Sequence, residues 1–155
     1  MSVQVKYICF GLGQEEFGIP LLSVKEVLAI PDITPVPQTP AHFLGIINLR
    51  GNVISVMDLR AKFGIKSTTA DETTVIILDF GDYQLGVVVD RVDSVLSVNP
   101  EQISNKPHIE SSKSTDYISG VYRQDQKLIL ILDIAKALSV EDRNIANRKT
   151  TDKTA

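Results

Sequence analysis

The sequence of 155 residues contains no tryptophan, one cysteine and two histidines, and only 6% of its residues are aromatic. A single cysteine cannot form a disulfide framework, and with two widely separated histidines it also excludes the usual structural zinc site. Cys9 stands between Ile8 and Phe10, which predicts a small buried apolar side chain. The sequence has neither a G-x-S-x-G nucleophile motif nor a glycine-rich phosphate loop with its lysine.

Basic residues are slightly outnumbered, with 16 Lys and Arg against 19 Asp and Glu, a net charge of −3. This balance argues against nucleic acid as a partner. No apolar run approaches the ~20 residues that a membrane helix requires. Residues 1–13 also lack the basic, apolar and small-residue pattern of an export signal. We therefore expect a soluble protein of the cytoplasm.

One sequence unit occurs twice in the chain. Residues 7–28 align without a gap with residues 75–96, and residues 45–63 align in the same way with residues 120–138. Each copy contains a hairpin signature around a glycine turn, then two further strands, and finally a short helical pattern behind an aspartate at the N-cap position. The predicted hairpins run over 10–18 and 78–86, the later strands over 46–47, 53–57, 121–122 and 128–132, and the helices over 59–63 and 134–138.

Short strands, polar turns and brief helices predict an all-β fold of two small β-barrels, over residues 1–70 and 71–140. A barrel of that size has a marginal core, so the halves either bury apolar surface against each other or exchange a strand. Their shared seam is then a natural groove. The proline-rich residues 31–43 are expected as an ordered loop or edge segment, residues 99–118 as a long loop, and residues 141–155 as a polar, frayed tail.

Few residues of the sequence are candidates for catalysis or metal binding. Asp58 and Asp133 occupy equivalent cap positions in the two copies, which is a structural role, and Asp90 could cap or turn the chain. His42 and His108 are not paired at the spacing of a metal site or a catalytic triad. We therefore expect no catalysis, no cofactor and no metal, and a protein whose function is to hold partners.

The two copies differ most at one turn, where NLRGN (48–52) faces RQDQK (123–127). Gly51 allows a tight turn, so Arg50 would be held rigidly at a barrel edge. A guanidinium fixed there suits recognition of a carboxylate or of backbone carbonyls on a partner. The alternative is an ion pair with an acidic neighbour of the same chain. The turn alone favours neither interpretation.

The stretch GIINLRGNVISVMDLRAKF (45–63), preceded by FGIPLLSVKEVL (17–28) and DITPVPQTPAHF (32–43), resembles the CheW family of bacterial chemotaxis adaptors and the homologous regulatory domain of the kinase CheA. The resemblance extends over about residues 5–140. It implies two SH3-like five-stranded barrels with short helices and no catalytic activity. No kinase, phosphotransfer or receiver segment accompanies it, which favours a stand-alone adaptor recruited to membrane receptor arrays.

The resemblance also implies functional residues. The receptor's cytoplasmic tip would contact the groove between the barrels at positions matching Val24, Gly45, Arg50 and Gly120, and CheA would bind at Glu26 and the surrounding surface of the first barrel. Val24 and Gly45 can equally be explained as core and turn residues. The alternative function is a CheW-like scaffold in another receptor–kinase pathway, such as surface motility or second-messenger signalling.

Overall fold

Short β-strands make up most of the regular structure. The computed structural model describes residues 4–65, 74–104, 117–138, 142 and 145. In this part of the chain the elements are β1 (Val5–Leu12), β2 (Glu15–Pro20), η1 (Leu21–Ser23), β3 (Val24–Ala29), β4 (Phe43–Leu49), β5 (Asn52–Asp58), α1 (Leu59–Phe63), β6 (Thr74–Asp79), β7 (Gln84–Val89), β8 (Arg91–Val98), η2 (Pro100–Gln102), β9 (Ile103–Ser104), β10 (Ile118–Gln124), β11 (Lys127–Leu132) and α2 (Ile134–Ala137).

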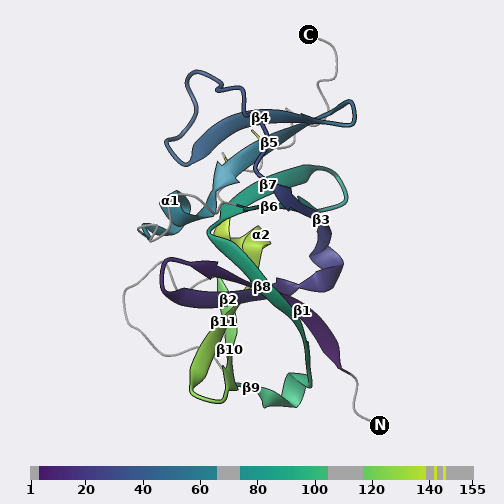
Figure 1. Ribbon diagram of the computed structural model, residues 1–155, viewed down its shortest axis with the longest axis vertical. Coiled ribbons are helices and arrows are strands. Elements are labelled where there is room, and N and C mark those ends of the chain that lie inside the picture. Colours follow the sequence, from purple (N-terminus) through teal and green to yellow (C-terminus); the bar gives the residue numbers. More distant parts are fainter. Residues whose placement is uncertain (1–3, 66–73, 105–116, 139–141, 143–144, 146–155) are drawn as a thin grey trace.

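The strands form two sheets, which follow one another along the long axis of the molecule (Figure 1). Sheet A has the order β8-β1-β2-β11-β10-β9, and sheet B has the order β3-β6-β7-β5-β4. Each sheet therefore combines strands from both sequence copies. Four pairings join the copies. Two are parallel, β11 with β2 and β5 with β7, and two are antiparallel, β1 with β8 and β3 with β6.

The sequence repeat is reproduced in the strand pairing. Phe10 lies opposite Phe17 in the β1–β2 hairpin, and their repeat counterparts Leu78 and Leu85 lie opposite each other in the β6–β7 hairpin. Both predicted hairpins are thus confirmed, as are the later strands. The edge strands β3 and β8, which are also repeat counterparts, were not predicted separately from the residues.

Each sheet curls and closes on itself. In sheet B the chain that follows β3 turns back, so that Thr34 bridges to Ile46 on the opposite edge strand β4. In sheet A the chain after β8 returns in the same way as β9, which pairs with β10 through Ser104 and Val121. The structure therefore has the predicted all-β architecture of two packed β-barrels with short helices, here called barrel A (sheet A) and barrel B (sheet B).

Buried apolar side chains form three groups, one inside each barrel and one in a central core between the barrels. Within β6, Val75 and Ile77 point into the interior of barrel B, whereas Ile76 and Leu78 point into a central core between the barrels. Strand β1 divides its side chains between barrel A and the central core in the same manner. Because both faces of these strands are buried, their sequences are almost continuously apolar.

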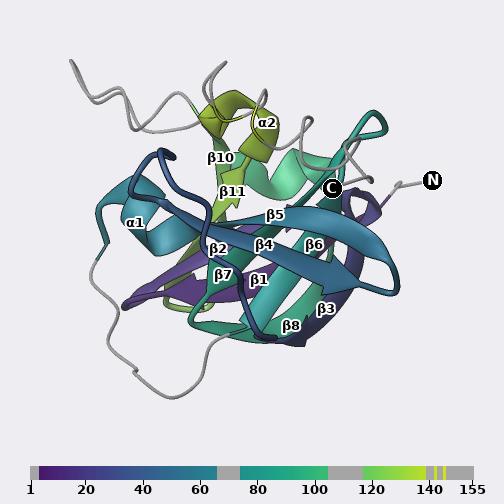
Figure 2. The same ribbon diagram turned by 90° about the horizontal axis from the view of Figure 1, so that it is seen from above.

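Both short helices begin as the sequence predicts. The Asp58 carboxylate accepts a hydrogen bond from the backbone N–H of Arg60 at 3.0 Å, and the Asp133 carboxylate accepts one from the N–H of Lys136 at 3.4 Å. Gly64 ends α1 in the left-handed conformation, with φ of 70°. The two helices lie at separate edges of the molecule when it is seen from above (Figure 2).

Two residues of the expected C-terminal tail are packed onto the fold. Asp142 is buried, and its carboxylate binds His42 Nε2 and Lys62 Nζ, each at 2.7 Å. Ile145 packs against the central core. The expectation of a frayed tail is therefore wrong for these two residues, because a buried ion pair and an apolar contact anchor them. The rest of the tail and His108 lie outside the described residues.

The described segments contain no helix that is both long enough and apolar enough to cross a membrane.

Candidate functional site

Arg50 and Glu26 form an ion pair that joins the two edges of sheet B. Arg50 Nη1 and Nη2 donate to Glu26 Oε1 and Oε2, both at 2.7 Å, in the two-pronged geometry typical of guanidinium and carboxylate. The hydrogen bond from Arg50 lowers the pKa of Glu26. The Arg50 side chain nevertheless stays 70% exposed. The sequence left open whether Arg50 pairs with an acidic residue of the same chain or stays exposed to a partner. In the structure Arg50 forms the ion pair and is also exposed.

The backbone at Arg50 is unusual. Arg50 has a φ of 53°, in the left-handed region that a large side chain seldom adopts. Its counterpart in the second copy, Asp125, has a φ of 55°, and aspartate tolerates this region better. The amide of Gly51 donates to Asn48 Oδ1 at 2.9 Å, which fixes the turn. The turn therefore holds a large side chain in a backbone conformation that glycine or aspartate adopts at lower cost.

Gly45 and Gly120 are buried and perform the same structural task in the two barrels. A Cβ on Gly45, which has a φ of 145°, would overlap the carbonyl oxygen of Thr34. A Cβ on Gly120 would overlap the side chain of Ile103. Each glycine thus admits the crossing segment that closes its barrel, and each coincides with a shift in strand register.

Val24 is half-buried at the start of β3 and packs against the central core. Of the four positions predicted to bind the receptor, only Arg50 therefore places a long side chain in solvent. The structure brings Arg50 into contact with Glu26, the position predicted to bind the kinase. It places Gly45 and Gly120 beneath the crossing segments at Thr34 and Ile103, where a substitution would act by displacing those segments.

A pocket of about 270 Å³ opens at the seam between the barrels. It is mainly apolar in its walls, with the single carboxylate of Asp133 at one side. Barrel A, barrel B and α2 all contribute to the lining, through Tyr7, Pro20, Leu78, Phe80, Ile131 and Ile134 among others. The seam at which the sequence predicts a groove thus contains a pocket.

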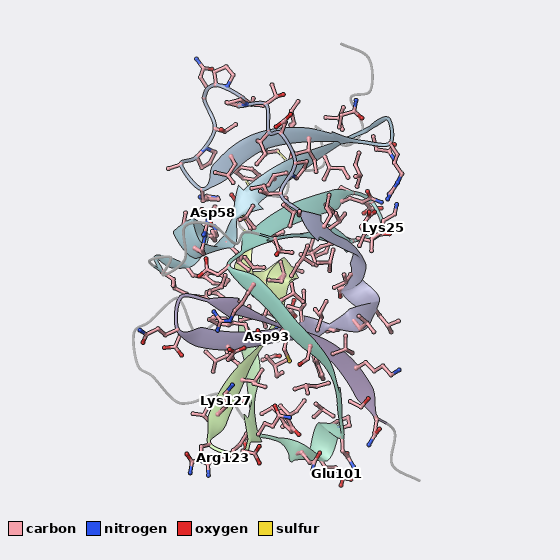
Figure 3. The ribbon with its side chains drawn as sticks, viewed as in Figure 1. Lys25, Asp58, Asp93, Glu101, Arg123 and Lys127 are labelled. Atoms are coloured by element: carbon pink, nitrogen blue, oxygen red, sulfur yellow. The ribbon has the colours of Figure 1, made fainter. Side chains whose placement is uncertain are left out.

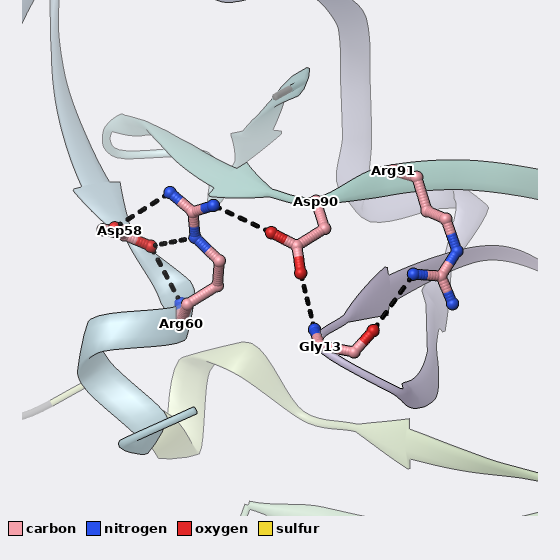
Figure 4. Close-up of polar contacts among 5 residues, drawn as sticks. All are labelled: Gly13, Asp58, Arg60, Asp90 and Arg91. Atoms are coloured by element: carbon pink, nitrogen blue, oxygen red, sulfur yellow. Dashed lines mark hydrogen bonds and ion pairs between the residues drawn. The ribbon is translucent and has the colours of Figure 1, made fainter. Parts of the chain in front are cut away.

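A buried charge network, shown in Figure 4, links the barrels at a second position. Arg60 binds Asp58 through Nε at 2.9 Å and Asp90 through Nη1 at 2.8 Å. The other oxygen of Asp90 accepts the amide of Gly13, in the β1–β2 turn of barrel A, at 2.6 Å. Asp90 is fully buried, and hydrogen bonds to Asp58 and Asp90 raise the pKa of Arg60.

Sequence reasoning treated Asp58 and Asp90 as local caps and overlooked Arg60. A signal was available, since neither Arg60 nor Asp90 keeps its charge in the other copy, where Ala135 and Leu22 stand. A charge that only one copy carries is not required by the repeated fold, so it indicates a role particular to that position.

A third polar region lies on barrel A, where Figure 3 labels Asp93 and Lys127. Arg91 binds Glu16 at 2.7 Å and Asp93 at 3.4 Å. Burial raises the pKa of Cys9, beneath this region, to about 11, so the thiol stays protonated at neutral pH. These contacts form an ion-pair cluster and supply no activated nucleophile. In the described part of the chain, no three His, Cys, Asp or Glu residues are grouped to hold a metal ion.

Comparison with known proteins agrees with this architecture. The family model described as a CheW-like domain matches residues 6–142. The chain is 37% identical over 142 residues to the chemotaxis protein CheW of Klebsiella aerogenes, covering 91% of this chain and 86% of that protein. It is 32% identical over 150 residues to CheW of Treponema pallidum, covering 93% and 88%.

Among solved structures, the scaffolding protein TtCheW of Thermoanaerobacter tengcongensis superimposes with a TM-score of 0.77 at 32% identity, covering 84% of this chain and 90% of that one. Sequence and structure therefore agree over nearly the whole chain, and the protein belongs to the CheW family of chemotaxis adaptors.

Proposed function

We propose that the protein couples the cytoplasmic tips of chemoreceptors to the histidine kinase CheA, without catalysis of its own. The observation that carries the proposal is the exposed Arg50–Glu26 ion pair. The resemblance assigns Arg50 to the receptor and Glu26 to the kinase, and the two side chains touch. A surface on which both assignments meet suits a protein that must sense one partner and act on another.

A receptor tip is a helical hairpin, and the seam between the barrels suits the binding of a helix in an apolar groove. Val24 lies at the edge of this seam, next to the pocket residue Ser23. Apolar side chains are also exposed nearby on β3, where Val27 is 39% exposed, and at its repeat counterpart Val95 on β8, which is 50% exposed. A helix packed there would cover side chains that otherwise face water.

The ion pair provides a physical route between partners. A receptor carboxylate that binds Arg50 competes with Glu26 for the same guanidinium donors. When Arg50 turns to the receptor, Glu26 regains a free negative charge on the surface proposed to bind CheA. By linkage, the factor by which receptor binding changes the affinity for CheA equals the factor by which CheA binding changes the affinity for the receptor.

Each contact of this kind would be weak on its own. In a receptor array, receptor, adaptor and kinase are held close together, so that linked weak contacts reinforce one another through effective concentration. The CheA regulatory domain resembles this chain in its double-barrel plan, which allows the two to alternate around a closed ring. We accordingly place the protein in the cytoplasm, recruited to membrane receptor arrays.

The test is capture of purified receptor signalling domain and CheA by single-charge variants. Arg50→Glu should lose receptor capture, and Glu26→Lys should lower kinase capture more than receptor capture. Arg123→Glu is the matched control for the first variant, because it makes the same charge change on the equivalent turn of barrel A. If Arg50→Glu and Arg123→Glu behave alike, the proposed receptor role of Arg50 is wrong.

A further inference from the structure

The pocket at the seam and the buried charge network are counterparts under the repeat. The network contains Asp58 at the end of β5 and Arg60 in α1. The corresponding positions, 75 residues later, are Asp133 and Ala135, and both line the pocket. One copy of the unit thus fills this place with an arginine side chain, and the other copy leaves it open.

The second component of the network is also missing from the pocket. Asp90 has Leu22 as its counterpart, and Leu22 is 99% exposed, whereas Asp90 is fully buried. The counterpart of Gly13 is Gly81, whose amide donates to Asp79 Oδ1 at 2.8 Å instead of to a carboxylate at the seam. The cap aspartate, Asp133, is the charged group that remains at the pocket.

We propose that this pocket binds an arginine side chain presented by a protein partner, which takes the place that Arg60 occupies in the other copy. Asp133 binds the guanidinium, as Asp58 binds that of Arg60. The aliphatic stem lies against Pro20, Phe80 and Ile134. The proposal rests on the adaptor function only in taking the occupant to be part of a protein.

The size and charge of the pocket fit one side chain. Its volume of about 270 Å³ is below the ~300–1,000 Å³ of sites for drug-sized ligands. Within the described residues, the Asp133 carboxylate accepts one long hydrogen bond, from Lys136 N at 3.4 Å, and forms no ion pair. A carboxylate has about four acceptor positions, so it can still take a two-pronged arginine. Ala135 is exposed, which leaves the entrance open.

The first experiment titrates the ¹⁵N-labelled full chain with N-acetyl-arginine amide and, separately, with the neutral isostere N-acetyl-citrulline amide. We expect chemical-shift changes at Ser119, Asp133 and Ala135 that are larger for the arginine probe. Asp133→Asn, which keeps a good N-cap residue, should reduce them roughly tenfold or more, as expected for loss of a hydrogen bond between charged groups. Equal responses to the two probes, or none at these amides, would overturn the proposal.

The second experiment fills the pocket from within. Ala135→Arg should pair with Asp133 as Arg60 pairs with Asp58, abolish the response to the arginine probe, and lower the affinity for receptor domain or CheA. Lys136→Arg is the matched control, since it places a guanidinium on the same helix outside the pocket lining. If Ala135→Arg binds both partners like wild type, the pocket inference fails while the adaptor proposal stands. Self-association that Ala135→Arg abolishes would assign the pocket to a second copy and overturn the inference.

Discussion

The strongest stability prediction concerns Arg60, which neutralises Asp90, the buried carboxylate that links the two barrels. Arg60→Ala leaves the fully buried Asp90 carboxylate without the guanidinium that neutralises it. The Arg60 side chain is only 15% exposed, so solvent screening is small. Removing one partner of a buried pair costs about 3–5 kcal/mol. For a chain of this length, at about 2–4 °C per kcal/mol, the melting temperature should fall by roughly 6–20 °C.

Thermal unfolding followed by circular dichroism measures this effect, with Arg50→Ala as the matched control. Both variants remove one arginine that binds carboxylate, but Arg50 is mostly exposed and its loss should shift the melting temperature by no more than a few degrees. Two results would refute the reasoning: an Arg60→Ala variant as stable as wild type, or equal losses for both variants. Either result would mean that burial of the Arg60 ion pairs does not determine how much they contribute to the stability of the fold.

Three further variants or reactions test other parts of the structure. Exchanging the charges in the double variant Glu26→Arg, Arg50→Glu should rebuild the ion pair but not receptor capture, because Arg50 also has to bind the partner; full recovery would mean that only the pair matters. Gly45→Ala should destabilise the fold by more than about 1 kcal/mol in thermal melts, because its φ is positive and Thr34 crosses there; an unchanged melting curve contradicts the close approach. Cys9, with a raised pKa of about 11, should react slowly with iodoacetamide at pH 8 until the chain unfolds, and rapid labelling of the folded protein would show that the thiol is accessible.

The sequence was informative wherever structure is local. The hairpins, the later strands and the N-caps Asp58 and Asp133 each depend on residues only a few positions apart, and the repeat supplied every pattern twice. Strand β3 was harder to recognise. In VKEVLA the half-buried and exposed residues alternate and none is fully buried, so the segment resembles a surface loop as much as an edge strand.

Partners distant in the sequence could not be predicted from periodicity. A pattern indicates that β2 and β11 are strands, but it does not state that they pair in parallel across more than 100 residues. The same limit applied at the site. Arg50 stood out because the two copies differ there, yet its contact with Glu26 arises only when the edges of sheet B meet. Arg60 and Asp90 likewise come together only because β5 and β7, which are distant in the sequence, pair in parallel in sheet B.

The exchange of hairpins has a consequence for an adaptor. Because the β1–β2 hairpin joins strands of the second copy and the β6–β7 hairpin joins strands of the first, the chain crosses between the barrels twice, after β2 and after β7. Barrel B is one continuous segment, and barrel A is built from the two segments on either side of it. These two crossings and the shared central core hold the barrels together, because moving them apart would expose that apolar core to water. A partner bound to barrel B is then held at a fixed position relative to a partner bound at the seam or on barrel A. Changes passed between partners must consequently be carried by exposed side chains such as Arg50 and Glu26, because the packed interior offers no hinge between the barrels.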